Sequence, residues 1–140
     1  MLAKLSRMLS SELPEDVQAL ANKLFQLARS GDPRNLAEYL DHGVDPNLKN
    51  HEGNSLLMLA AYSGNEEALE VLIQRGADVD ALNDRGQSPL AGAIFKKEQG
   101  VVEKLIQAGA DPALGQPNAI ETARMFGQDE LVQRLEGHGA

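Results

Sequence analysis

Apolar residues recur along the chain with the three-and-four spacing of short amphipathic helices. Between Gly53 and Asp78 one stripe precedes Gly64 and a second precedes Gly76: Leu57, Ala60 and Ala61, and then Ala68, Leu69, Leu72 and Ile73. This spacing places the apolar side chains on one helix face. Glycine often ends a helix, because it readily adopts the left-handed conformation that follows the last turn. The segment therefore predicts two short antiparallel helices followed by an extended connector.

The same pattern returns from Gly86 to Asp111 without a gap. Its stripes are Leu90 and Ala93, and then Val101, Val102, Leu105 and Ile106. The glycines that close the second helices, Gly43, Gly76 and Gly109, follow one another at intervals of 33 residues. A fixed period in this range indicates stacked structural repeats rather than one continuous globular core.

Two further units, at the ends of the chain, show only part of the pattern. The first offers Leu24, Leu27 and Ala28 and then Leu36, Tyr39 and Leu40; the fourth offers Ile120, Ala123, Leu131, Val132 and Leu135. The approach to the fourth unit is three residues shorter than the approach to the third, with Gln116 standing where Gly86 stood. Terminal repeats are atypical because they cover the open ends of a stack.

The turn inside the third unit departs from this pattern. Lys97 stands where Gly64 stands in the second unit. A lysine adopts the left-handed conformation only at a cost. This position therefore predicts either a strained turn or a turn displaced toward Gly100.

These repeats resemble the ankyrin family over roughly residues 20–140. The residues that carry the resemblance are Gly53, Ser55, Leu57, Ala60, Ala61, Gly64, Gly76, Ala77 and Asp78, and then Gly86, Ser88, Pro89, Leu90, Ala93, Gly109, Ala110 and Asp111. Leu56 replaces the family's helix-opening proline, and Met58 and Ala91 replace its histidine. The resemblance implies an all-α ankyrin-repeat solenoid of about four helix-turn-helix repeats.

The segment before the repeats predicts further helical structure at the N-terminus. Leu2, Leu5 and Leu9 share a helical face, and Pro14 suits the first turn of a new helix. We expect residues 1–13 to form an N-terminal helical extension and residues 14–140 to form the repeat domain. Its repeats would span roughly 14–47 (N-terminal cap), 51–80, 84–113 and 117–140 (C-terminal cap). A helix lying on a membrane surface is the alternative, which the nearby carboxylates disfavour.

Charge and composition narrow the classes of partner. The net charge of −8 disfavours nucleic acid and anionic membranes, and it allows a basic protein partner. The longest apolar run, residues 56–62, is too short to cross a bilayer. Lys4 and Arg7 interrupt the stretch that would be apolar in a signal peptide. We expect a cytoplasmic protein.

The sequence offers no constellation for catalysis. It has no cysteine, and His42, His51 and His138 lie in different repeats without neighbouring residues at ligand spacing. Phosphate-binding and nucleophile motifs are missing. We expect no enzyme activity, no cofactor and no metal.

In ankyrin proteins, partners bind the concave side formed by the finger tips and the first helices. Carried onto this chain, the resemblance implies these protein-binding residues: Arg29, His51, Glu52, Asn54, Tyr62, Ser63, Asp84, Arg85, Gln87, Phe95, Lys96, Met125 and Phe126. Large apolar side chains recur near one position in this set, at Tyr62, at Phe95 and at Met125 or Phe126. Such residues favour the core of an interface. The alternative is that their side chains pack between adjacent repeats.

We therefore expect a monomeric, non-catalytic module that binds a protein partner through its concave finger and inner-helix face. A structural or self-associating scaffold is the alternative, although the polar last helix and the N-terminal extension would cap both ends. An enzyme with a dispersed site is the remaining hypothesis.

Overall fold

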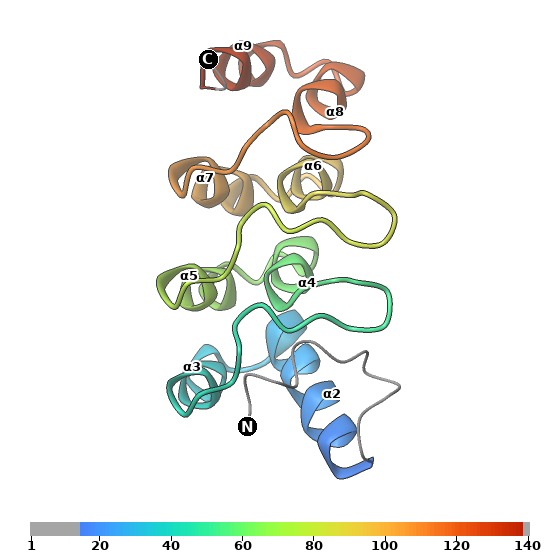
Figure 1. Cartoon of the computed structure of the whole chain (residues 1–140). Coiled ribbons are helices and arrows are strands. Elements are labelled where there is room, and N and C mark those ends of the chain that lie inside the picture. The colour runs from blue at the N-terminus through green and yellow to red at the C-terminus, as the bar shows by residue number, and fades with distance from the viewer. Residues whose placement is uncertain (1–14, 139–140) are drawn as a thin grey trace.

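The computed structural model describes residues 15–138, whose helices form four consecutive pairs (Figure 1). The pairs are α2 (Glu15–Ser30) with α3 (Pro33–Asp41), α4 (Leu56–Ser63) with α5 (Glu66–Gln74), α6 (Pro89–Phe95) with α7 (Gln99–Gln107), and α8 (Ala119–Met125) with α9 (Asp129–His138). The described part contains no strand, only an isolated bridge between Lys49 and Ser55. The expected all-α helical-repeat solenoid is confirmed. The expected extension of residues 1–13 lies outside the described residues.

The helix pairs stack one above the next (Figure 1). α2, α4, α6 and α8 form one column, here termed the inner helices, and α3, α5, α7 and α9 form the other, the outer helices. Connectors between the pairs project on the side of the inner helices as fingers (Figure 1). Gly53 and Gly86 allow the first two fingers to turn, since their φ angles of 77° and 72° are costly for other residues.

The core is built from the periodic apolar stripes. Leu72 and Leu105 occupy equivalent positions on α5 and α7, and both are fully buried. Ile73 was expected in the buried stripe but is only partly buried. The buried face of α5 is therefore narrower than the spacing predicts.

Polar caps at the helix starts explain where the inner helices begin. The side chains of Ser55 and Ser88 accept hydrogen bonds from the backbone N–H groups of Met58 and Ala91, both at 3.1 Å. At α8, Asn118 and Glu121 form a reciprocal capping box. Each cap satisfies backbone donors that have no partner inside the helix. The Ser55 cap is therefore retained in the unit where Leu56 replaces the helix-opening proline.

The aspartates that follow Gly76 and Gly109 shape the connectors. The carboxylates of Asp78 and Asp111 accept hydrogen bonds from the backbone N–H groups of Asp80 and Ala113, both at 2.9 Å. Such a bond two residues ahead stabilises a turn. Each of these aspartates also donates its own N–H to the preceding repeat: Asp78 to Asn47 at 2.7 Å and Asp111 to Asp80 at 2.8 Å. The Gly-Ala-Asp motif therefore both turns the chain and joins successive repeats.

Asn47 and Asp80 make the same bond with different side chains, and this difference predicts a stabilising change. Burial raises the pKa of the Asp80 carboxyl, and the carboxylates of Asp111 and Asp78 oppose its ionisation further. Asp80→Asn should keep the bond to the Asp111 N–H and remove the repulsion. Because Asp80 is still partly solvated, we expect a gain of only about 0.5 kcal/mol in the free energy of unfolding at pH 7.

The pH dependence of this stability gain follows from the direction of the Asp80 pKa shift. A raised pKa means that the folded state binds the proton more tightly, so ionised Asp80 destabilises the fold above its folded pKa. The stability difference between Asp80→Asn and the unaltered protein should be complete at pH 7. It should shrink as the pH falls through the raised pKa toward the ordinary aspartate range. Urea unfolding at several pH values measures it, and a pH-independent difference would contradict the assignment.

The turn between α6 and α7 is strained rather than displaced. Lys97 has a φ of 61°, close to the 73° and 68° of Gly64 and Gly127 at the equivalent positions. Gly100 lies inside α7, so the alternative of a turn shifted to this glycine is wrong. A left-handed residue other than glycine costs about 1–2 kcal/mol.

Lys97→Gly should therefore raise the free energy of unfolding by about 1 kcal/mol. The gain is smaller than the full strain because glycine also increases the entropy of the unfolded chain. Thermal and urea unfolding measure it. A loss of stability would show that Lys97 makes contacts in the fold that outweigh the strain.

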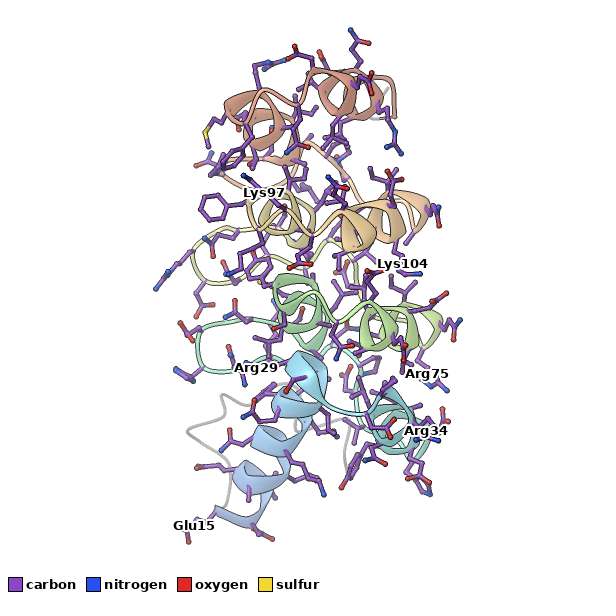
Figure 2. All side chains as sticks on the ribbon, turned by 180° about the vertical axis from the view of Figure 1, so that it is seen from behind. Glu15, Arg29, Arg34, Arg75, Lys97 and Lys104 are labelled. Carbon is purple, nitrogen blue, oxygen red and sulfur yellow. The ribbon has the colours of Figure 1, made fainter. Side chains whose placement is uncertain are left out.

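Ion pairs connect successive outer helices. Arg75 pairs with Asp41 at 2.9 Å, Lys104 with Glu70 at 3.2 Å, and Arg134 with Glu103 at 2.6 Å. Arg75 and Lys104 lie on the same side of the stack in Figure 2. Each pair is partly exposed, and exposed pairs contribute at most about 1 kcal/mol. They align the outer column but do not hold the stack together.

Candidate functional site

The thirteen residues proposed for partner binding lie in two kinds of element. Seven are at the C-terminal ends of inner helices or directly after them: Arg29, Tyr62, Ser63, Phe95, Lys96, Met125 and Phe126. Six are in the fingers or at their bases: His51, Glu52, Asn54, Asp84, Arg85 and Gln87. Both sets belong to the column of inner helices and the connectors that project beside it (Figure 1).

Five of them line one groove of about 440 Å³, here termed the inner-helix groove. Its lining comprises Tyr62, Gln87, Phe95, Lys96 and Met125 from the proposed set, together with Ala91, Gly92, Pro117 and Thr122. The groove runs from the end of α4 across α6 to α8. Phe95 is 59% exposed and Met125 is 64% exposed. The groove therefore presents large apolar side chains to solvent rather than burying them.

Tyr62 behaves differently from Phe95 and Met125. Its hydroxyl donates to the Ser88 carbonyl at 3.2 Å, and burial raises the pKa of this phenol to about 12. Its ring occupies the space where a side chain at Gly92 would be. Tyr62 thus packs between adjacent repeats, as the alternative interpretation expects, and forms a wall of the groove.

This contact predicts a coupled pair of substitutions. A Cβ atom at Gly92 would overlap the Tyr62 ring. Gly92→Ala should therefore destabilise the protein by about 1–2 kcal/mol, because the overpacking outweighs the gain in helix propensity. In a Tyr62→Ala background the same substitution should instead stabilise by about 0.5–1 kcal/mol. Urea unfolding of the four proteins measures the coupling, and equal effects in both backgrounds would disprove the contact.

Phe95 and Phe126 form an aromatic pair at the edge of the groove. Their ring centroids are 5.7 Å apart and the rings meet edge to face at 68°. Phe126 is 40% exposed and follows the last residue of α8. The ammonium of Lys97 lies 5.8 Å from the centroid of Phe126. Met125, and not Phe126, lines the inner-helix groove together with Phe95.

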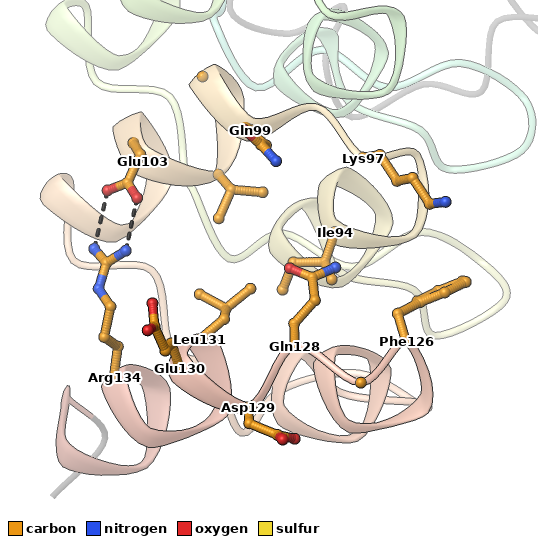
Figure 3. Close-up of a pocket in the computed structure, with 13 residues that line it drawn as sticks. Ile94, Lys97, Gln99, Glu103, Phe126, Gln128, Asp129, Glu130, Leu131 and Arg134 are labelled. Atoms are coloured by element: carbon orange, nitrogen blue, oxygen red, sulfur yellow. Dashed lines mark hydrogen bonds and ion pairs between the residues drawn. The ribbon is translucent and has the colours of Figure 1, made fainter.

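Phe126 of this pair borders a second, larger groove of about 940 Å³ between the last two repeats (Figure 3). Ile94, Val102 and Leu131 contribute its apolar surface. The ion pair of Glu103 and Arg134 lies at one end, and Lys97 and Phe126 lie at the other (Figure 3). Phe95 therefore lines the inner-helix groove and Phe126 lines the second groove.

The other proposed residues do not line the inner-helix groove. Arg29 and His51 line a smaller hollow beside Phe25 and Asn50. Asn54 accepts a hydrogen bond from the Asn83 side chain at 2.8 Å, which links successive fingers. The remaining residues, Glu52, Ser63, Asp84 and Arg85, are exposed outside the groove.

Sequence reasoning missed Gly92 and Lys97 as parts of this surface. Gly92 lies inside α6, where glycine weakens a helix, and this position could have indicated the close approach of another side chain. From the sequence alone, Lys97 is notable only as an unusual turn residue. Its cationic side chain beside an aromatic ring becomes evident only in the folded chain.

Residues 15–138 contain neither a metal-ligand cluster nor a membrane-spanning helix. Their histidines, aspartates and glutamates form no group of three that could hold a metal ion. Within the same range, no helix combines the length and apolar character needed to cross a membrane. The lining of the inner-helix groove is apolar apart from a few polar groups and one lysine.

Comparison with known proteins agrees with this architecture. A family model described as three copies of ankyrin repeats matches residues 24–115. The chain is also similar to a Pseudomonas aeruginosa protein described as an ankyrin repeat protein, with 49% identity over 51 residues. That stretch covers 36% of this chain and 30% of the relative. Because the family model spans more than half of the chain, this protein belongs to the ankyrin-repeat family.

Proposed function

We propose that this protein is a non-catalytic binding module whose protein partner docks in the inner-helix groove. Ankyrin repeats are generally protein–protein interaction modules, and the family is generally non-enzymatic. The partner and its site are our proposal. We expect the protein to act as a monomer, with one chain binding one partner molecule.

One observation carries this proposal. Among the described residues, the exposed large hydrophobic side chains are Phe95, Met125 and Phe126, and they lie at the ends of two neighbouring inner helices. Single exposed apolar residues are ordinary, but a cluster beside a groove is typical of an interaction site. Aromatic and methionine side chains are also enriched at interfaces.

Site-specific photo-crosslinking tests the location. A photoreactive phenylalanine analogue would replace Phe95 in one protein and Gln107, an exposed residue at the end of α7, in a control protein. We expect a crosslinked partner from position 95 and none from position 107. A product from position 107 alone would place the partner on the outer helices and contradict the proposal.

Size-exclusion chromatography with light scattering separates this proposal from the self-associating scaffold. We expect the mass of one chain at micromolar concentration. A mass that rises with concentration, and falls when Phe95 and Met125 are replaced by alanine, would assign the exposed cluster to self-association.

A further inference from the structure

We infer that the segment bound in the inner-helix groove is apolar and acidic, with at least one carboxylate beside the side chain that enters the groove. This inference rests on the proposed function and specifies the chemistry of the partner. It differs from the basic partner that the net charge of −8 allows.

Most cations that pair with a carboxylate belong to the outer column, although Arg124 on α8 also pairs with Glu136. Those on the outer helices are paired with carboxylates, as for Arg75, Lys104 and Arg134. Lys96 and Lys97 follow α6, and both are exposed. Within residues 15–138, no carboxylate lies within ion-pairing distance of either lysine. In Figure 2, Lys97 lies nearer the fingers than Arg75 and Lys104 do.

The two lysines flank the exposed aromatic pair. Lys96 is the one charged residue among those that line the inner-helix groove. Lys97 holds its ammonium over the Phe126 ring on the other side of the pair. On α8, the carboxylate of Glu121 already accepts a hydrogen bond from the Asn118 N–H at 2.9 Å. An apolar side chain in the groove would thus lie beside Lys96, with Lys97 on the far side of the aromatic pair, and neither lysine has a carboxylate partner among the described residues.

The backbone at Lys97 supports a role for its charge. The equivalent residues Gly64 and Gly127 adopt the same left-handed conformation without a side chain. Strained residues of this kind cluster at functional sites, where the strain is compensated by function. The local turn does not require a lysine, whereas binding of a carboxylate would use its ammonium.

Short-range charge, rather than net charge, governs contacts in the groove. Exposed charges are screened beyond about 10 Å at moderate ionic strength, so the acidic outer surface acts weakly on a bound segment. An unpaired ammonium beside an apolar surface gains a charge-assisted hydrogen bond when a carboxylate approaches. The charge complementarity therefore favours glutamate or aspartate next to the apolar anchor.

A selection from a random peptide library tests this inference. Phage-displayed 12-residue peptides would be selected on the immobilised full-length protein and, in parallel, on its Phe95→Ala/Met125→Ala variant. We expect the peptides retained only by the unaltered protein to combine an aromatic or aliphatic residue with aspartate or glutamate within about three positions. A synthetic peptide of the enriched sequence then serves as the probe for fluorescence anisotropy.

Charge variants give the quantitative test. Lys96→Ala/Lys97→Gly should weaken binding of the acidic probe about tenfold, because two exposed ion pairs are lost. It should not weaken folding, since glycine relieves the turn. As a control, Lys23→Ala/Arg34→Ala removes the same net charge far from the groove, together with the exposed Arg34–Asp32 pair, and should change the affinity less than twofold. Equal losses in both variants would assign the effect to net charge and overturn the inference.

The possible failures are distinguishable. Groove-dependent peptides that are basic or uncharged would overturn the acidic partner while the proposed groove remained. If no peptide distinguishes the unaltered protein from Phe95→Ala/Met125→Ala, the groove binds no short segment, and both the inference and the proposed site fail.

Discussion

Leu72→Ala and Leu105→Ala should each lower the free energy of unfolding by about 2–5 kcal/mol. Both leucines are fully buried at equivalent positions, on α5 and α7. Truncation removes apolar contacts and leaves a cavity that helices packed on several sides cannot close. Urea unfolding monitored by circular dichroism measures the loss.

A control residue beside Leu72 sharpens this expectation. Ile73 on the same helix is only partly buried, so Ile73→Ala should cost clearly less. Each repeat is stabilised by its neighbours, so the short array should unfold in one transition whichever leucine is changed. Equal costs at positions 72 and 73, or a nearly unchanged midpoint for Leu72→Ala, would show that the buried face of α5 is misassigned.

The second large effect concerns binding. Phe95→Ala/Met125→Ala should weaken binding of the partner captured by crosslinking at position 95 about a thousandfold. The helicity should stay near that of the unaltered protein. Each residue is an exposed apolar anchor, and truncating such an anchor at an interface centre costs about 2 kcal/mol or more. Two together amount to about 4 kcal/mol, or roughly three decades in Kd. Tyr62 is left intact, because its ring packs over Gly92 and its removal would disturb the stack.

Gln74→Ala/Gln107→Ala is the matched control. Both glutamines are exposed at the ends of outer helices, and their replacement should leave the affinity unchanged. Arg75 is unsuitable for this purpose because it pairs with Asp41. If the control loses the partner and Phe95→Ala/Met125→Ala retains it, the binding face is the outer one.

The sequence predicts the repeat architecture because each unit repeats its apolar spacing and its closing glycine. Stacking lets such short helices bury their stripes, and a fixed period of this length indicates stacking. The strain at Lys97 is also predictable, since its glycine counterpart in the preceding unit defines the required conformation.

The details of the groove depend on how one repeat lies on the next. Tyr62, Phe95 and Met125 hold equivalent positions, yet only Tyr62 meets a glycine in the next inner helix and becomes partly buried. Phe95 lines the groove together with Thr122 and Met125 and remains exposed. The pairing of Phe95 with Phe126 likewise depends on the turn after α8, which no periodicity describes.

A hydrogen-exchange footprint of the complex tests most directly whether the partner occupies the inner-helix groove. Exchange rates of the free protein would be compared by mass spectrometry with those of the protein bound to the captured partner. We expect slower exchange in residues 84–96 and 115–126, which form a finger, α6 and α8, and unchanged exchange in α7 and α9. Protection confined to α7 and α9, with α6 and α8 unaffected, would contradict the account.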